Sequence, residues 1–461
     1  MKLTSNNYLF SNFNINYSGE STSKTNLSIN NIYNLTTRNN CIEPANNFSN
    51  LLNLYFSNEL ISKLTLTNNE TINNIVYFYK FDYLDYDFNE VKSRYFILND
   101  KFSLFEINTY ENILLDLNLK FNKKPIFTIF NEKLYIYSHN DLFLMINQDN
   151  YPIVLSDVLN IKSIVKYDKY TVFNCIENKF SIFYSELTDL SNLEVNISNY
   201  NEIKLLAENG EIEKIFVYKN NIFVAQKYSI SKIILQDDNY KIQSLCSIKS
   251  SIIQNSIDLI DDYVIFLTHS GLYIFDGNDT KQIFKAETNN LIKSNVKAIS
   301  YNNKYYLKCN YFVNHIKEDL ILEFDVENEN CTFYKLDNII DFYLLQTLND
   351  YKLIVITNNN QNEIKFLDLE SITSLKKYIK FNKLTFDETP VKVLNEIKII
   401  SAGKYSLTVS SEIQSSTFEI NGVSYIRNIG IKGQAFEIEI ESDTSFKIEA
   451  IYVKTTSYTE G

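Results

Sequence analysis

The sequence predicts an all-β protein that repeats one structural unit, and three observations support this prediction. Apolar residues make up 45% of the 461 residues, with 34 Tyr and 32 Phe, and aromatic and β-branched side chains favour strands. Alanine, the strongest helix former, is scarce, and Trp is absent. Between about residue 90 and residue 370, a cluster of Asn, Asp and Lys is followed repeatedly by a strand-like run.

The repeat has the length of a β-propeller blade. The strand-like runs begin at Leu134, Tyr170, Ile222, Val264, Tyr305 and Leu353. Their spacings of 36, 52, 42, 41 and 48 residues average about 44, the period of a four-stranded blade. We therefore expect residues 71–375 to form a β-propeller of six or seven blades, the count depending on residues 95–98. The six residues should be buried between neighbouring blades, because a blade cannot cover both of its faces alone.

The region after the repeat is expected to form a separate antiparallel β-sandwich, residues 376–461. It holds five of the nine glycines of the chain. Residues 436–441 alternate apolar side chains with glutamates, as a half-buried strand does. Residues 446–453 are predicted to be the partner of this strand, across a turn at Asp443 and Thr444.

The region before the repeat, residues 1–70, is polar and rich in Asn, apart from an apolar stretch at residues 48–66. We expect it to be irregular and to serve assembly. Its first residues lack the apolar core of a signal peptide, and no apolar run in the chain approaches the ~20 residues of a membrane span. The sequence thus predicts a protein without a membrane span.

The cysteines and the net charge exclude several classes of protein. The five cysteines are scattered along the chain, at Cys41, Cys175, Cys246, Cys309 and Cys331. This spacing predicts neither a disulfide framework nor a zinc ribbon. The net charge is −12, whereas gripping a nucleic-acid backbone needs clustered Lys and Arg. An acidic surface is compatible with DNA passing by, since like charge prevents adhesion.

One short segment resembles a calcium-binding loop. Asp85, Asp87 and Asn89 have the opening spacing of such a loop. However, Glu90 occupies the position of the turn glycine, and Phe96 that of the closing bidentate glutamate. The segment is interpreted as a solvated acidic loop rather than a metal site.

The other candidate acid–base residues also have simpler interpretations. Asp258, Asp261 and Asp262 could be paired carboxylates, but the last two lie at the turn position of the repeat, where Asp is favoured. His139 and His269 occupy equivalent hairpin turns of two repeats, which indicates scaffold symmetry rather than a catalytic pair. His315 stands alone in a polar stretch and is expected to be exposed.

No nucleophile elbow, phosphate loop, dinucleotide fingerprint or zinc-protease motif occurs in the sequence. Nine glycines in the whole chain leave little room for phosphate-cradling loops. We therefore expect no catalytic, cofactor-binding or metal-binding residues, and a protein that is not an enzyme.

Three segments resemble the β-propeller structural proteins of tailed bacteriophages. Residues 181–192 contain a strand that ends in Tyr-Ser and is followed by an Asp/Asn turn. Residues 264–278 contain a hydrophobic strand followed by Gly-Leu-Tyr, an aromatic residue and Asp-Gly. Residues 427–440 match an Arg…Gly…Gly-x-x-Phe-x-Ile-x-Ile pattern of the last domain. The resemblance extends over residues 160–461, with Phe, Tyr and Asn where the family uses Trp and Gly.

The resemblance implies a virion structural protein of a short-tailed phage, assembled in the host cytoplasm. It would be a tail hub or nozzle subunit, near the head–tail connector, in a ring of identical copies that is usually a hexamer. Its partners would be other copies, further tail and connector proteins and tail fibres, and DNA would pass through the channel without specific binding during ejection.

Two other functions remain open from the residues. A carbohydrate-binding propeller, acting in receptor recognition or as a surface lectin, would need exposed aromatics and paired carboxylates around one channel. An intracellular propeller scaffold would show Trp-Asp or Gly-Gly at fixed offsets, and neither dipeptide occurs.

Overall fold

A computed structural model of the chain describes residues 2–10, 12–15, 26–33, 35–38, 41–50, 75–85, 87–109, 113–130, 133–138, 142–146, 152–155, 161–186, 197–236, 239–260, 262–284, 291–313, 316–327, 330–346, 351–358, 362–372, 376–381, 383–385 and 391–459. These residues form β-strands joined by turns, together with two short 3-10 helices, η2 (Ile197–Asn199) and η3 (Ala207–Asn209). The prediction of an all-β protein is confirmed.

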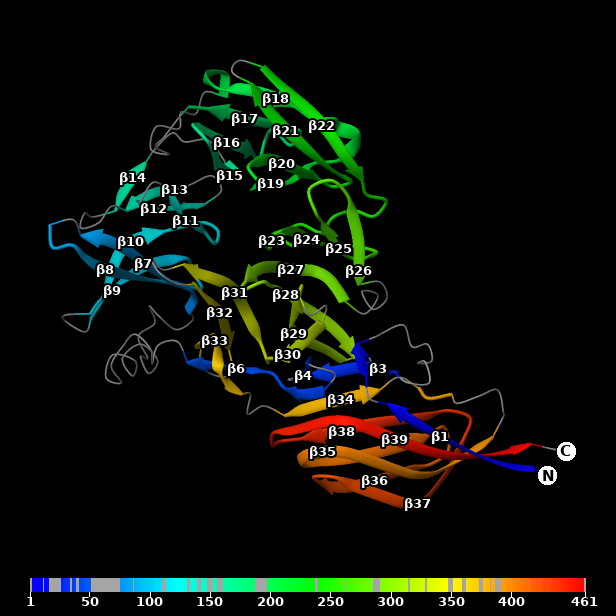
Figure 1. Cartoon of the computed structure of the whole chain (residues 1–461). Coiled ribbons are helices and arrows are strands. Elements are labelled where there is room, and N and C mark those ends of the chain that lie inside the picture. Colours follow the sequence, from blue (N-terminus) through cyan, green and yellow to red (C-terminus); the bar gives the residue numbers. More distant parts are fainter. Residues whose placement is uncertain are drawn as a thin grey trace.

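Most strands belong to four-stranded antiparallel sheets that follow one another along the chain (Figure 1). The first sheet contains β7 (Ile75–Asp85), β8 (Glu90–Asn99), β9 (Ser103–Asn108) and β10 (Ile113–Lys120). The second contains β11 (Ile126–Phe130), β12 (Lys133–Ser138), β13 (Leu142–Ile146) and β14 (Ile153–Leu155). The third contains β15 (Ile161–Tyr167), β16 (Tyr170–Cys175), β17 (Ser181–Ser185) and β18 (Asn201–Lys204).

The next three sheets repeat the same order of strands. The fourth contains β19 (Ile212–Tyr218), β20 (Asn221–Gln226), β21 (Ser229–Gln236) and β22 (Asn239–Ser247). The fifth contains β23 (Asp258–Ile260), β24 (Tyr263–Thr268), β25 (Gly271–Phe275) and β26 (Thr280–Phe284). The sixth contains β27 (Leu291–Tyr301), β28 (Lys304–Val313), β29 (Ile316–Asp325) and β30 (Asn330–Lys335).

The seventh sheet is completed by a strand from the N-terminal region. Its members are β31 (Ile339–Gln346), β32 (Tyr351–Asn358), β33 (Asn362–Ile372) and β6 (Asn46–Asn50). Strand β31 in turn lies beside β7 of the first sheet. The Tyr343 hydroxyl joins the two strands, because it accepts a hydrogen bond from the backbone N–H of Phe78 at 3.1 Å and donates one to the carbonyl of the same residue. The last sheet is thus connected to the first.

The six predicted repeat positions all lie in the second strands of successive sheets, from β12 to β32. Five of them are 0% exposed, as predicted: Leu134, Ile222, Val264, Tyr305 and Leu353. The prediction is wrong for Tyr170, which is half-buried. Tyr170 is the first residue of β16 and pairs with Tyr167 at the hairpin end, so the next residue, Thr171, takes the buried position. A shift of one residue along a strand reverses the side-chain face.

The predicted Asn- and Asp-rich turns connect the first and second strands of several sheets. Between β19 and β20, Lys219 and Asn220 have φ angles of 44° and 54°, and between β27 and β28, Asn302 and Asn303 have 49° and 56°. Two successive positive φ angles are typical of the tight hairpin turns whose twist matches that of the flanking strands. Asn enters this left-handed region more easily than most residues. The repeated turn residues therefore have a backbone role.

The remaining strands form one eleven-stranded sheet that combines both ends of the chain. The N-terminal members are β1 (Lys2–Phe10), β2 (Asn12–Ile15), β3 (Asn26–Tyr33), β4 (Leu35–Arg38) and β5 (Cys41–Pro44). The C-terminal members are β34 (Lys377–Phe381), β35 (Lys392–Ser411), β36 (Ser415–Asn421), β37 (Ser424–Gly433), β38 (Phe436–Ser442) and β39 (Phe446–Thr459).

The prediction that residues 1–70 are irregular is wrong for the described residues among them. Strand β1 pairs with β39 over its whole length, from Lys2 opposite Thr459 to Phe10 opposite Ile451. These strands are rich in Asn, Ser and Thr, and their conformation follows from pairing with strands far away in sequence rather than from local hydrophobic alternation. Most of the apolar stretch 48–66 lies outside the described residues.

A second correction concerns the pairing of the last two strands. The alternation in β38 is confirmed, because Phe436, Ile438 and Ile440 are 0% exposed. However, β38 and β39 are not partners. The 20-residue strand β35 lies between them, pairing with β39 through its first half and with β38 through its second half. The short turn after β38 therefore connects it to a strand on the other side of β35, and β39 does not pair with β38.

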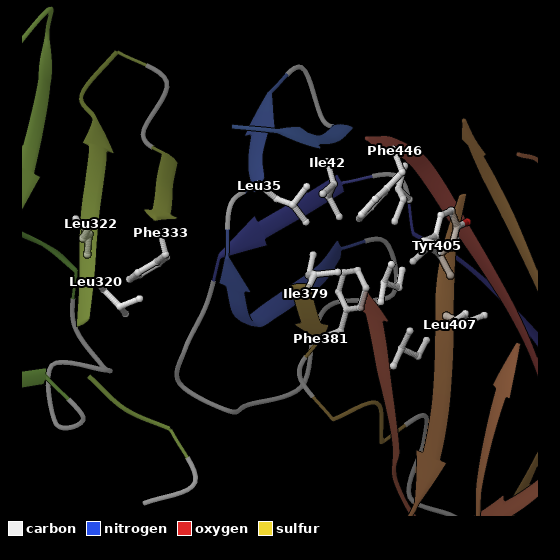
Figure 2. Packing of buried hydrophobic residues seen from close by; sticks show 14 of the residues in the cluster. Leu35, Ile42, Leu320, Leu322, Phe333, Ile379, Phe381, Tyr405, Leu407 and Phe446 are labelled. Carbon is white, nitrogen blue, oxygen red and sulfur yellow. The ribbon is translucent and has the colours of Figure 1, made fainter. Parts of the chain in front are cut away.

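The eleven-stranded sheet shares a hydrophobic core with the sixth four-stranded sheet (Figure 2). Leu320 and Leu322 of β29 belong to this core together with Leu35 of β4, and further residues extend it to β5, β30, β34, β35 and β39. These residues are Phe333, Ile42, Ile379, Phe381, Tyr405, Leu407 and Phe446. Burial of so many large side chains, each worth about 1.5–3 kcal/mol, holds the two parts of the chain together.

Candidate functional site

The segment that resembles a calcium-binding loop is a turn closed by its own backbone. Asp85 is 6% exposed, and its Oδ1 accepts hydrogen bonds from the backbone N–H groups of Asp87 (3.0 Å) and Phe88 (3.4 Å). Its other carboxylate oxygen lies 2.5 Å from the Nζ of Lys92. The hydrogen bond to Lys92, together with the backbone N–H groups, lowers the pKa of Asp85. Both carboxylate oxygens are therefore already occupied within this hairpin.

The candidate aspartates of the fifth sheet also have partners. Asp258 forms an ion pair with Lys214 at 3.2 Å and accepts a hydrogen bond from the backbone N–H of Ser300. The side chain of Asp262 is exposed, and its Oδ1 lies 3.5 Å from the Nζ of Lys219. Asp261, the third member of the group, lies outside the described residues. The structure therefore brings no catalytic carboxylate pair together from the two that it describes.

Of the three histidines, the structure describes His269, which is exposed in the turn between β24 and β25. His139 and His315 lie outside the described residues. Within the part of the chain that is described, no three His, Cys, Asp or Glu residues gather in a group that could hold a metal ion. The same part contains no helix long and apolar enough to cross a membrane.

Lysines link the first strands of neighbouring sheets at a recurrent position that the sequence patterns did not reveal. Lys162 of β15 donates a hydrogen bond to the carbonyl of Ile212 at 2.5 Å, and Lys214 of β19 donates one to the carbonyl of Ile257 at 2.7 Å. Each of these lysines also faces a carboxylate on the next first strand, as does Lys297 of β27. The pairs are Lys162–Glu213 (3.9 Å), Lys214–Asp258 (3.2 Å) and Lys297–Asp341 (3.2 Å).

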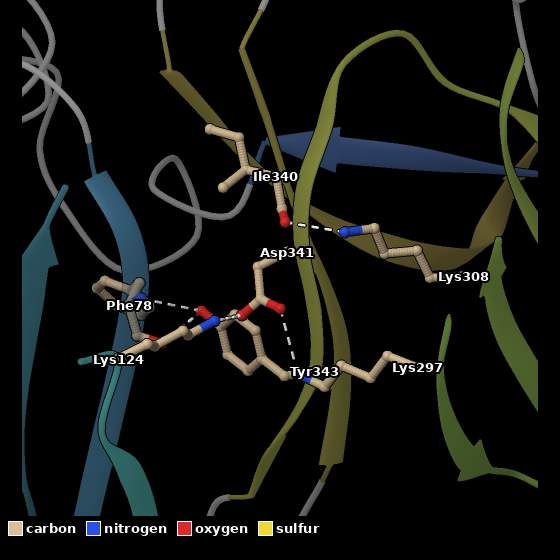
Figure 3. A network of polar contacts seen from close by, with 7 residues as sticks. All are labelled: Phe78, Lys124, Lys297, Lys308, Ile340, Asp341 and Tyr343. Atoms are coloured by element: carbon tan, nitrogen blue, oxygen red, sulfur yellow. Dashed lines mark hydrogen bonds and ion pairs between the residues drawn. The ribbon is translucent and has the colours of Figure 1, made fainter. Parts of the chain in front are cut away.

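Asp341 of β31 is the most enclosed member of this set (Figure 3). Its side chain is 8% exposed, and it forms ion pairs with Lys297 and with Lys124, which precedes β11. Burial opposes ionisation of the carboxyl, but the two ammonium groups outweigh it and lower the pKa of Asp341. Burial also lowers the pKa of Lys124, although Asp341 opposes this shift. A third lysine, Lys308, donates to the neighbouring carbonyl of Ile340 at 2.9 Å.

Tyrosine hydroxyls link neighbouring sheets near the opposite end of the first strands. Tyr167, the last residue of β15, donates to the carbonyl of Asn220 at 3.3 Å, and Tyr218, the last residue of β19, donates to the carbonyl of Asp262. Each acceptor lies in or beside the first hairpin turn of the next sheet. The two tyrosines are equivalent in the repeat, so this link is a feature of the repeated unit.

A pocket of about 400 Å³ lies where the third and fourth sheets meet. Its wall includes Asn174 and Cys175 at the end of β16, and Lys162 and Ile212 at the beginning of β15 and β19. It also includes residues of the connections between strands, namely Lys123, Ile176, Glu177, Lys179, Glu211 and Gln254. The wall thus combines three ammonium groups, two carboxylates and two amides.

Two groups in this wall have no hydrogen-bond partner among the described residues. Asn174 is 1% exposed, and while its Oδ1 accepts a hydrogen bond from Ser163 at 2.6 Å, its Nδ2 is buried and unpaired. Lys123 is exposed, and its ammonium group has no ion pair with another described residue. By contrast, Lys179 forms an ion pair with Glu211 at 2.6 Å, and this hydrogen bond lowers the pKa of Glu211.

No sequence pattern indicates this pocket, because its residues come from five separate segments of the chain. The available signal was a lysine four or five residues before the end of three first strands, at residues 162, 214 and 297. Burial raises the pKa of the Cys175 thiol to about 12, which makes this cysteine a poor nucleophile at neutral pH.

No protein-family model matches the sequence, and no curated protein matches it. Among solved structures, the chain is similar to the extracellular domain of a hybrid two-component system from B. thetaiotaomicron, with a TM-score of 0.37 and 13% identity over 70% of this chain and 40% of that chain. It is also similar to Hsv2 from Kluyveromyces lactis (TM-score 0.30, 11% identity, 53% of this chain and 81% of that chain). A third similar structure is the core factor of S. cerevisiae (TM-score 0.37, 9% identity, 71% of this chain and 60% of that chain).

The chain spans 40% of the length of the first of these proteins. At such scores and identities, the similarities carry no information on activity, ligands or partners.

Proposed function

We propose that the seven four-stranded sheets are the blades of a single β-propeller, and that the chain is a structural protein of a phage tail. In this proposal the chain is not an enzyme. It forms a hub or nozzle ring around the DNA channel, and the eleven-stranded sheet, folded as a β-sandwich, holds the copies together.

The propeller is supported by the order and the contacts of the sheets. Their strands follow the chain within each sheet, the first strands lie side by side in the pairs β15–β19, β23–β27 and β27–β31, and β31 returns to β7. The strand β6 completes the last sheet with an N-terminal segment, as a closed ring requires. The lysine and tyrosine links recur between neighbouring sheets, which is expected if the sheets are related by rotation about one axis.

The observation that carries the assembly proposal is a difference between the two parts of the chain. The seven four-stranded sheets follow one another along the chain, whereas β36 and β37 pair only with β35 among the described strands. Apolar side chains are exposed beside these strands, with Ile413 69%, Val423 63% and Tyr425 49% exposed. Open strand edges with exposed apolar residues are a template for association. Figure 1 places β36 and β37 at the end of the molecule opposite β18 and β22.

The charge of the chain supports the passage of DNA rather than its binding. The net charge is −12, and a surface of like sign keeps a polyanion from adhering. The surface that faces the channel would be net negative, and duplex DNA would bind negligibly at moderate salt. Replacing acidic channel residues with Lys would slow ejection without preventing assembly.

The oligomeric state tests this proposal directly. Native mass spectrometry and electron microscopy of the purified chain should show a closed ring, with each contact burying more than ~1,000 Å². The double variant Ile413→Glu with Val423→Glu should dissociate the ring and leave the melting temperature of the monomer unchanged. Val154→Glu is the control, because Val154 is 51% exposed but belongs to β14 in the second sheet. A protein that stays monomeric at high concentration and in the virion would refute the assembly role.

A further inference from the structure

The pocket between the third and fourth sheets has the features of a ligand site. Its volume of about 400 Å³ lies within the range of small-molecule sites. Four of the lining residues, Lys162, Asn174, Cys175 and Ile212, lie at strand ends, and the other six belong to the connections between strands.

Unpaired donors in the wall point to an acceptor that is missing from the protein itself. Buried amide groups are almost always hydrogen-bonded, so the unpaired Nδ2 of Asn174 calls for a partner. The free ammonium group of Lys123 is the second donor, and Lys162 is held in the wall by the carbonyl of Ile212. An amide N–H donor together with one unpaired ammonium group can bind a carboxylate group of a ligand.

The other groups of the wall restrict the class of this carboxylate. Glu177 and Glu211 are acceptors for hydroxyl groups, and Gln254 can both donate and accept. Lys179 already pairs with Glu211, so Glu177 is the carboxylate that would disfavour a second negative charge on the ligand, such as that of phosphate. The residues that line the pocket include no aromatic ring on which a neutral sugar could stack. A ligand with one negative charge and several hydroxyl groups would satisfy both the unpaired donors and the acceptor groups of the wall.

We propose that this pocket binds a small hydroxylated carboxylate of the acidic monosaccharide class, with Asn174 and Lys123 at the carboxylate and Glu177, Glu211 and Gln254 at the hydroxyl groups. This site goes beyond the assembly role, and it lies on the four-stranded sheets rather than on the sheet that would join the copies. It gives the chain a means of recognising an acidic glycan.

Binding of glucuronate to the full-length protein, measured by isothermal titration calorimetry and ligand-observed NMR, tests the proposal. We expect saturable binding of one glucuronate per chain, with glucose and inorganic phosphate each binding at least tenfold more weakly. Lys123→Ala should weaken glucuronate binding at least tenfold. Asn174→Asp, which keeps the acceptor for Ser163 but replaces the donor by a negative charge, should abolish it.

Lys204→Ala is the matched control, because Lys204 belongs to β18 of the same sheet, is 77% exposed and does not line the pocket. It should bind glucuronate as the unaltered protein does. Absence of binding, equal binding of glucose or phosphate, or binding unchanged by Lys123→Ala would each overturn the proposal. None of these results depends on the oligomeric state of the protein. The proposal of a ring can therefore be refuted without refuting the binding site, and the binding site can be refuted without refuting the ring.

Discussion

Replacing Asp341 by Asn should destabilise the fold in a pH-dependent way. The substitution preserves the shape of the side chain and removes the charge that Lys124 and Lys297 share. The two ammonium groups are then left facing each other without a counter-charge. Because the three residues come from β31, from the segment before β11 and from β27, the loss affects contacts between sheets rather than within one sheet.

The expected cost follows from the exposure of the three side chains. Asp341 is 8% exposed, but the lysines are 36% and 35% exposed, so solvent screens part of the attraction. Removing one partner of a fully buried pair costs about 3–5 kcal/mol, and an exposed pair contributes less than about 1 kcal/mol. We expect about 2 kcal/mol for Asp341→Asn, a fall in melting temperature of about 2 °C for a chain of this size.

The pH dependence distinguishes this mechanism from a loss of packing. The pKa of Asp341 is lower in the folded than in the unfolded protein, so its charge stabilises the fold above the unfolded value of about 4. That stabilisation is lost as the pH falls through the folded pKa. The difference in melting temperature between the protein and the variant should therefore be full at pH 7 and shrink at acidic pH.

Differential scanning calorimetry between pH 7 and pH 3 measures this difference, with Asp262→Asn as the control. Asp262 is 78% exposed and lies 3.5 Å from a half-exposed Lys219, so its loss should cost less than about 0.5 kcal/mol. Equal shifts for the two variants, or a shift for Asp341→Asn that does not change with pH, would refute the reasoning.

Three further changes test other parts of the fold. Tyr343→Phe removes both hydrogen bonds to Phe78 and should cost about 1–2 kcal/mol in thermal unfolding, with a larger loss of amide protection in β7 and β31 than elsewhere. Gly403→Ala should cost more than about 2 kcal/mol, because φ is +92° and the added Cβ would lie 2.4 Å from a backbone oxygen. Gly422→Ala, at φ +72° with nothing within 4 Å, should cost only about 1 kcal/mol, and equal costs would contradict the packing argument. Deleting residues 1–50 removes β1–β6, the partners of β33, β34 and β39, and should produce concentration-dependent aggregation in light scattering. A soluble monomer would show that these strands need no partner.

The sequence was informative wherever structure depends on neighbouring residues. The turns between first and second strands were predictable because Asn and Asp accept positive φ angles, as Asn220 and Asn303 do. The buried second strands followed from the apolar runs after these turns. One error of a single residue, at Tyr170, arose because composition does not fix register.

Pairing between distant segments was not predictable. Nothing local in β38 and β39 indicates that β35 separates them, and nothing in the polar strand β1 indicates that it pairs with β39. The pocket was missed for the same reason, since Lys123, Asn174 and Glu211 become neighbours only when three sheets come together. Its chemistry depends on one unpaired amide, which no sequence pattern reports.

The origin of β6 has a consequence for biosynthesis. Residues 46–50 leave the ribosome well before their partner β33, residues 362–372, and at about 5–20 residues per second the delay is roughly half a minute. Six sheets can form in order of synthesis during that time, but the seventh cannot. Strand β6 must wait unpaired until β33 is synthesised, and β1 until β39 is synthesised, and both are exposed to other nascent chains during that time. A chaperone that shields this N-terminal segment is therefore expected to raise the yield of folded protein more than one that acts on the finished chain.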